Sequence, residues 1–336
     1  MQLRSGWARG TGLVVAAGLL VLMAFWSVAA GAKSIPLGTV WQALAHYDPS
    51  IDDHLIVRSL RVPRTVLGLI VGGALGVGGA VLQGVTRNPL ADPALLGIQS
   101  GAALGVVIGI HALGIATLGG YVWLAFAGAC LASVVVYGLG SIGRGGATPV
   151  KLALAGAALA YLLSAGTSAI LLLDVRTLDQ FRFWMVGSLA GRDASIAVGV
   201  APFLLIGLVV AFASARSLNN LALGDDVARS LGQRVALARA GSMLAVTLLC
   251  GAATAACGPI AFIGLTIPHA ARAICGPDYR WILPWSLVLA PVLLLGSDVV
   301  GRLVTRPGEL QVGVVTALIG APAFVVLVRR RRLAEL

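Results

Sequence analysis

The sequence predicts an all-α integral membrane protein with about ten transmembrane helices. Its mean hydropathy is +0.95, and of its 336 residues 58% are hydrophobic while only 11% are charged. A water-soluble domain of this length needs more charged side chains to cover its surface. Since one span takes roughly 20 apolar residues, the apolar runs indicate the number of helices.

Ten apolar runs have about the length of a membrane span, and we expect them to form one transmembrane domain over residues 1–336. The runs lie near residues 12–32, 64–85, 95–113, 117–140, 151–173, 196–215, 240–257, 258–275, 281–301 and 312–328. Only Gly258-Pro259 separates the seventh run from the eighth, and both are short. Losing one of these two spans would reverse the orientation of everything that follows.

Basic residues set the predicted orientation, because short cytoplasmic loops carry an excess of Lys and Arg. With the N-terminus inside and ten spans, the inner segments hold most of the 24 basic residues and few of the 13 acidic residues. Both termini are therefore predicted in the cytoplasm. The net charge of +11 is explained by this topology, and no basic stripe with interleaved aromatic residues indicates nucleic-acid binding.

The stretch TRNPLADPALLGI, residues 86–98, interrupts two apolar runs on the predicted inner side. Pro89 and Pro93 forbid a continuous helix, and Asp92 is placed to cap the helix that follows. One interpretation is a capped turn. The small residues in GIQSGAALG, however, would let helices approach closely or line a cavity. The segment could therefore also form part of a pathway wall.

The longest inner loop, residues 216–239, predicts a short amphipathic helix. Asp225 and Asp226 follow Gly224, where acidic residues suit a helix N-terminus, and Gly232 is placed to end the helix. Apolar residues recur at every fourth position, namely Leu223, Val227, Leu231 and Val235. Such a helix lies either on the lipid surface or in a groove of a cytoplasmic partner.

Arginines also cluster on the predicted outer side, where basic residues are not expected. They are Arg58, Arg61 and Arg64 before the second span, and Arg302 and Arg306 after the ninth. Two explanations are open. These arginines could pair internally with Asp48, Asp52, Asp53 or Glu309. Alternatively, they could bind carboxylates on a soluble partner, because the planar guanidinium suits that task.

No motif in the sequence indicates catalysis, a metal or a bound cofactor. Lys33 and Lys151, the only lysines, lie outside any GxxxxGK[ST] loop, so no nucleotide phosphate site is expected. The four histidines and four cysteines lack the spacing of a metal site. Asp298 is the one acid deep in a predicted span, and we expect Arg302, one turn later, to pair with it.

Several motifs together resemble a known family. They are RVPR (61–64), NPLADPALLG (88–97), FWMVGSL (183–189), LALGDDVARSLG (221–232), GPIAFIGLTIPHAAR (258–272) and ELQVGVVTALIGAPAF (309–324). They are similar to the permeases of bacterial ABC importers for iron–siderophore complexes, haem and cobalamin. The similarity covers residues 30–328 and is greatest to the ferric-siderophore members.

The resemblance implies a type II ABC importer permease fold in the bacterial cytoplasmic membrane. It implies pairing with a second permease subunit, either an identical chain or a similar one. Two cytoplasmic ATPase subunits would use ATP and Mg²⁺, and a soluble substrate-binding protein would dock outside. This chain itself would bind no cofactor. The cargo would be an iron–siderophore complex, with haem or cobalamin as the alternative.

The resemblance also assigns roles to residues. The ATPase-coupling residues would be Gly224, Asp225, Asp226, Ala228, Leu231 and Gly232. Arg61, Arg64 and Arg302 would receive carboxylates of the binding protein. The inner gate would lie in residues 143–152, where Thr148 supplies a hydroxyl, and Asn88 and Pro89 would line the path. Residues 174–193 would form a short outer helix before the sixth span.

Two rival classes differ in the residues that they need. A secondary transporter driven by protons or sodium needs ionisable residues along a relay in the membrane, and only Asp298 qualifies. A membrane-embedded enzyme needs a cluster of catalytic side chains at one depth, and the sequence shows none.

Overall fold

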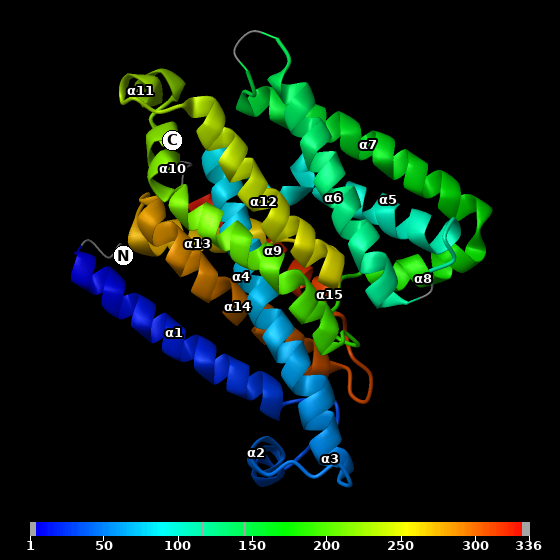
Figure 1. The fold of residues 1–336 in the computed structure, drawn as a ribbon. Helices are drawn as coiled ribbons and strands as arrows, with labels where there is room; N and C mark the ends of the chain where they lie inside the picture. Colours follow the sequence, from blue (N-terminus) through cyan, green and yellow to red (C-terminus); the bar gives the residue numbers. More distant parts are fainter. Residues whose placement is uncertain (1–4, 116, 144–145, 331–336) are drawn as a thin grey trace.

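The computed structural model describes residues 5–115, 117–143 and 146–330, and these residues form helices joined by turns, without a strand (Figure 1). Seven helices are long and apolar enough to cross a membrane. They are α1 (Gly6–Ala29), α4 (Val62–Thr86), α6 (Leu118–Ser141), α7 (Pro149–Leu173), α9 (Ala194–Ala213), α12 (Val235–Cys257) and α14 (Tyr279–Val304). The prediction of an all-α membrane protein is confirmed.

Three shorter helices occupy the remaining predicted ranges. They are α5 (Ile98–His111), α13 (Ile263–Cys275) and α15 (Val312–Arg330). Each of the ten predicted ranges thus contains one helix. Ten crossings would put both ends of the chain on one side of the membrane, which the distribution of basic residues identifies as the cytoplasmic side.

The break between α12 and α13 falls at the predicted Gly258-Pro259 step. Gly258 has φ +78° and Phe262 has φ +68°. A right-handed helix cannot continue through residues with positive φ. A Cβ on Gly258 would lie 2.1 Å from the carbonyl oxygen of Trp184, so only glycine fits there. The Ser188 amide also donates to the Cys257 carbonyl at 2.7 Å. The break is therefore held against the chain segment that follows α8.

Helix α4 is the central element, and it packs against α9, α12, α13 and α14. It is buried along most of its length. A Cβ on Gly79 would lie 2.0 Å from the Gly264 carbonyl oxygen of α13, and one on Gly72 would lie 2.7 Å from Cα of Pro291 of α14. Small residues let membrane helices approach closely enough for dispersion contacts to hold them. The glycines of α4 thus set its distance to two neighbours.

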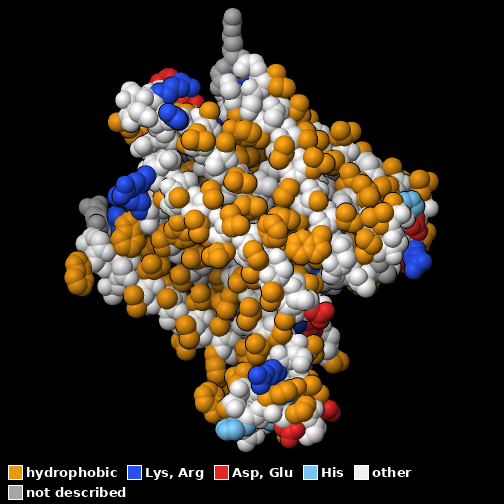
Figure 2. Space-filling view, viewed as in Figure 1, with side chains coloured by type: hydrophobic (Ala, Val, Ile, Leu, Met, Phe, Trp, Pro, Cys, Tyr) orange, Lys and Arg blue, Asp and Glu red, His pale blue; other side chains and the backbone are white. Residues whose placement is uncertain are grey.

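The outer surface of the bundle is apolar, as a lipid-facing surface must be. Helices α1 and α7 are the least buried spans, and they expose side chains such as Leu22, Leu154 and Leu162. Figure 2 shows hydrophobic side chains over the middle of one face, with charged side chains toward its ends. Large apolar side chains therefore lie both in the interior, as Trp184 and Leu82 do, and on the surface that faces the lipid.

Short helices cover the two ends of the bundle. At the outer end lie α2 (Leu37–Ala45), α3 (Asp52–Leu55), the π-helix η1 (Ile56–Arg61) and α8 (Val175–Met185). At the inner end lie the 3-10 helix η2 (Pro93–Leu96), α10 (Ala215–Ala222) and α11 (Asp225–Ser230). Figure 1 shows α2 and α3 at the end opposite α10 and α11. Helix α8 lies in the predicted outer segment 174–193.

We expect Gly79→Val to destabilise the fold by about 1–3 kcal/mol, the usual range for overpacking a tight contact. The added carbons would collide with the backbone of α13, which cannot move aside as a side chain can. Thermal unfolding in detergent measures the effect. Gly138→Ala on α6 is the matched control, because a Cβ there meets nothing within 4 Å. Equal unfolding temperatures for the two variants would contradict the packing argument.

Candidate functional site

A buried carboxylate joins two arginines near the outer end of the bundle. Asp298 of α14 is 0% exposed. The Arg302 guanidinium, one turn later, lies 2.9 Å from its Oδ2 atom, so the predicted pair is confirmed. Arg64 of α4 also donates to both carboxylate oxygens of Asp298, at 2.7 to 3.1 Å. Asp298 therefore holds α4 against α14.

Arg64 has a second acidic partner at the surface. Its Nη1 atom donates to Glu309 Oε2 at 2.6 Å, across the turn between α14 and α15. Glu309 is one of the acids considered for internal pairing. Its side chain is 33% exposed, against 11% for Arg64. Arg64 thus lies between a buried acid and a solvent-facing one.

Arg61 and Arg302 bind the end of α1 rather than solvent. Their guanidinium groups donate to the carbonyl oxygens of Ser27, Val28, Ala29, Ala30 and Lys33. The last carbonyls of a helix lack helical partners and carry partial negative charge, so cations stabilise them. Arg61 is 4% and Arg302 1% exposed. Most of their donors are thus occupied within the chain. That these two arginines receive carboxylates of a soluble partner stays a prediction.

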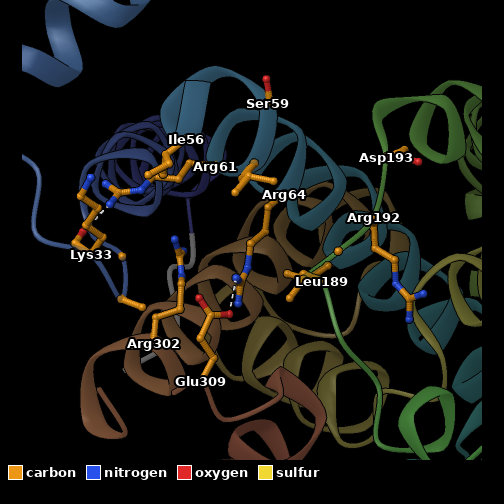
Figure 3. Close-up of a pocket in the computed structure, with 15 residues that line it drawn as sticks. Lys33, Ile56, Ser59, Arg61, Arg64, Leu189, Arg192, Asp193, Arg302 and Glu309 are labelled. Atoms are coloured by element: carbon orange, nitrogen blue, oxygen red, sulfur yellow. Dashed lines mark hydrogen bonds and ion pairs between the residues drawn. The ribbon is translucent and has the colours of Figure 1, made fainter. Parts of the chain in front are cut away.

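A pocket of about 490 Å³ opens beside this cluster at the outer end. Arg61 and Arg64 line one side and residues 189–193 line another. Figure 3 shows Arg64 joined to Glu309, and Arg192 pointing away from the other arginines. The pocket is therefore bordered by charged groups, most of which are already paired within the chain.

The inner loop forms the predicted helix over a shorter range. Helix α11 begins at Asp225, directly after Gly224 with φ +102°, and ends before Gly232 with φ +78°. Ala228 faces inward and packs with Leu221 and Val235. Val235 does not belong to the exposed stripe, because it begins α12. The three other apolar residues of the stripe are exposed, namely Leu223, Val227 and Leu231.

Asp225 ties α11 to two spans. Its Oδ1 atom lies 2.7 Å from Arg239 of α12 and 3.4 Å from Arg87 at the end of α4. Asp226, by contrast, pairs only locally with Arg229 at 2.9 Å, and its side chain is 97% exposed. Of the two acids predicted at this N-terminus, Asp225 makes the contacts that position the helix.

Helix α10 is attached to α14 by a second acid. Asp278 caps α14 and accepts a hydrogen bond from Asn219 of α10 at 2.7 Å. The amide of Tyr279 donates in return to Asn219. Burial alone would raise the pKa of Asp278, but hydrogen bonds from Arg280 and Asn219 lower it to about 2. Asp278 is thus ionised at neutral pH, and the attachment persists there.

The candidate gate residues lie at the inner ends of α4 and α7. Asn88 accepts a hydrogen bond from the Leu90 amide at 2.9 Å, and Thr148 caps α7 through the Lys151 amide. Asn88 therefore stabilises a turn, and Thr148 caps a helix. Asn88 nevertheless shares a pocket of about 220 Å³ with Pro149, the residue after Thr148, and Pro89 is Asn88's neighbour. Arg144 and Gly145 of the gate segment lie outside the described residues.

Asp92 caps η2 as predicted. Its side chain accepts from the Ala94 amide at 2.9 Å. The capped helix is a single 3-10 turn, however, and α5 begins only at Ile98, after Gly97 with φ +68°. Both interpretations of residues 86–98 fit this geometry, because the capped turn also borders the pocket beside α7.

Comparison with known proteins identifies the family. The model of the FecCD transport family matches residues 19–330. The chain belongs to the FecCD transport family. This chain is 48% identical to the ferric enterobactin transport system permease protein FepD of Escherichia coli K12, and the match covers 93% of each chain. It is 46% identical to the iron(3+)-hydroxamate import permease FhuB of Bacillus subtilis 168, covering 96% of this chain and 84% of FhuB.

The fold of this chain is also found in a solved structure. A metal-chelate type ABC transporter in an inward-facing conformation superposes with a TM-score of 0.84 at 28% identity. The match covers 96% of this chain and 100% of that one. The FecCD chain is therefore a multi-pass permease subunit of an ABC importer in the cytoplasmic membrane, a transport component and not an enzyme.

The sequence did not predict the ion pairs between distant parts of the chain. Arg64 meets Asp298 from 234 positions away, and Arg87 meets Asp225 across more than a hundred. No local spacing signals such pairs. Asp298 was the available clue, because it is the one acid deep in a predicted span and a buried carboxylate is stable only when cations lie next to it.

We expect Asp298→Asn to lower the stability of the FecCD chain by about 3–5 kcal/mol, the usual cost of breaking a buried ion pair. Arg64 and Arg302 would lose their shared counter-charge, and repulsion would separate α4 from α14. Thermal unfolding in detergent measures the loss. Asp179→Asn is the control, because Asp179 pairs with Arg182 on the surface and should change little. A stable Asp298→Asn protein would show that the arginines need no acid.

Proposed function

We propose that this permease moves an iron–siderophore complex into the cytoplasm. The observation that carries the proposal is the 48% identity to a ferric enterobactin permease over nearly the whole of both chains. The hydroxamate permease, at 46% identity, also has an iron chelate as its named cargo. Haem or cobalamin is the second candidate, because permeases named for these cargoes share at least 37% identity with the chain.

In this proposal a second permease subunit, identical or similar, completes the path. Two cytoplasmic ATPase subunits use ATP and Mg²⁺, and the chain itself binds no cofactor. Moving a two-state equilibrium from 1:99 to 99:1 needs about 5.5 kcal/mol of differential stabilisation. The partners' ATP cycle would supply this free energy.

Helix α11 is the proposed contact with the ATPase. Val227 of α11 and the flanking Leu223 and Leu231 are exposed apolar side chains that suit a groove on a protein partner. Asp225 transmits the contact to α4 and α12 through Arg87 and Arg239. Gly224, Ala228 and Gly232 shape the helix, and Asp226, which pairs only with Arg229, is exposed to the partner.

The soluble binding protein is proposed to dock at the outer end. Arg64 is the best placed of the three arginines assigned to docking, because its side chain retains some exposure beside Glu309. Arg61 and Arg302 support that surface indirectly by fixing the end of α1. At the other end of the path, Asn88, Pro89 and Thr148 are proposed to line the inner opening.

The secondary-transporter alternative loses its one candidate residue. Asp298 is bound by two arginines, so protonating it would leave two buried positive charges without a counter-ion. A proton or sodium relay therefore has no starting point among the acids of the described spans.

Uptake into proteoliposomes tests the cargo. The permease is reconstituted with its ATPase and binding protein, and uptake of a ferric siderophore, haem and cobalamin is measured with ATP inside. We expect ATP-dependent uptake of the siderophore alone. Uptake of haem or cobalamin instead would change the cargo, and uptake with a hydrolysis-deficient ATPase would contradict an ABC mechanism.

The coupling role of α11 predicts a separation of ATP hydrolysis from uptake. We expect Gly224→Ala together with Gly232→Ala to lower uptake at least tenfold while hydrolysis continues. Both glycines have positive φ, which alanine adopts only at a cost of about 1–2 kcal/mol per residue, so the helix would shift against its partner. Gly138→Ala is the matched control. Normal uptake in the double variant would reduce α11 to a surface helix.

A further inference from the structure

A pocket of about 510 Å³ lies at the inner end of α6 and α12, next to Thr148 and including Gly146 and Ala147 of the candidate gate segment. Its walls come from Tyr137 of α6, from Ala147, and from residues of α11, of the first turns of α12 and of the segment between them. Three arginines line it, namely Arg229, Arg234 and Arg239. Among the lining residues that the structure describes, none is acidic. The pocket therefore presents positive charge at the cytoplasmic edge of the bundle.

The three arginines differ in how far their charge is already balanced. Arg239 pairs with Asp225 and Arg229 pairs with Asp226. Arg234 is exposed, and it makes no ion pair within the part of the chain that the structure describes. In the pocket, Arg234 therefore has no acidic partner, whereas Arg229 and Arg239 pair with acids outside the pocket.

Two buried polar atoms in the pocket walls lack partners. The Arg239 side chain is only 4% exposed, yet its Nε–H donates to no described residue. Gln233 donates through Nε2 to the Ser217 carbonyl, but its Oε1 atom accepts nothing. An unsatisfied buried donor or acceptor costs free energy. Both atoms are enclosed, so these side chains must turn toward the pocket before a ligand with anionic oxygens and a hydroxyl group can satisfy them.

The surface next to the pocket is suited to acyl chains. Helices α6 and α12 lie side by side (Figure 1), joined by a hydrogen bond between Ser133 and Thr247. Along these helices apolar side chains are exposed, namely Leu131, Val134, Leu237 and Leu244. A lipid of the inner leaflet would place its chains on these residues and its headgroup at the level of the arginines.

We propose that this pocket binds the phosphate of an anionic phospholipid whose headgroup carries hydroxyl groups, as in phosphatidylglycerol. Arg234 and the Nε–H of Arg239 bind phosphate oxygens, since guanidinium forks match phosphate geometry. Gln233 accepts a headgroup hydroxyl. Because Arg239 also holds Asp225, the bound lipid stabilises the attachment of α11 to α12.

Lipid titration followed by native mass spectrometry tests the proposal. The full-length chain, purified in an uncharged detergent, is titrated with phosphatidylglycerol or with phosphatidylcholine of the same acyl chains. We expect the Arg234→Gln, Arg239→Lys double variant to bind phosphatidylglycerol at least tenfold more weakly, because two charge-assisted hydrogen bonds are lost. Phosphatidylcholine binding should not change.

The same assay provides a control variant and distinguishes a bound lipid from a soluble anion. Arg216→Gln removes one charge from an exposed position of α10, outside the pocket, and should retain tight binding. Arg239→Lys keeps a cation for Asp225, and Arg234→Gln alone serves if the double variant misfolds. Unchanged binding in these variants, or equal loss in Arg216→Gln, would overturn the proposal. So would displacement of phosphatidylglycerol by equimolar inorganic phosphate, which would make the ligand a soluble anion.

Discussion

The buried carboxylate of Asp298 is the constraint on which the arrangement of the outer half depends. A charge without water or a partner is very costly in a lipid-embedded bundle. Arg64 from α4 and Arg302 from α14 surround it. Arg302 then extends to the carbonyls at the end of α1. One acid thereby fixes the relative positions of three helices, in a medium where the hydrophobic effect does not hold helices together.

Helix α4 links this constraint to the opposite end of the protein. At its outer end Arg64 binds Asp298, and after its inner end Arg87 lies beside Asp225 of α11. Between these points the contacts of Gly72 and Gly79 leave no room for α4 to slide past its neighbours. In the proposed mechanism, displacement of α11 therefore reaches the outer end through a closely packed helix.

The sequence predicted what local patterns control. Apolar length located the ten helices, Gly258-Pro259 located the break between α12 and α13, and the four-residue spacing of Asp298 and Arg302 paired them. It could not predict contacts set by the packing of distant helices, such as Arg64 with Asp298 or Arg61 with the end of α1. The apolar repeat included Val235 because it continues in register past Gly232, although the chain turns there and Val235 begins α12.

The arginines at the two ends of the bundle show why residue type alone does not define a site. At the outer end Arg61 and Arg302 are almost fully buried, and backbone carbonyls occupy their donors. At the inner end Arg234 is exposed, and buried Arg239 has a donor without a partner. A guanidinium already satisfied by carbonyls gains little from a new anion, whereas an unsatisfied one gains a full charge-assisted hydrogen bond. The availability of donors, more than the number of charges, therefore decides which end can accept an anionic ligand.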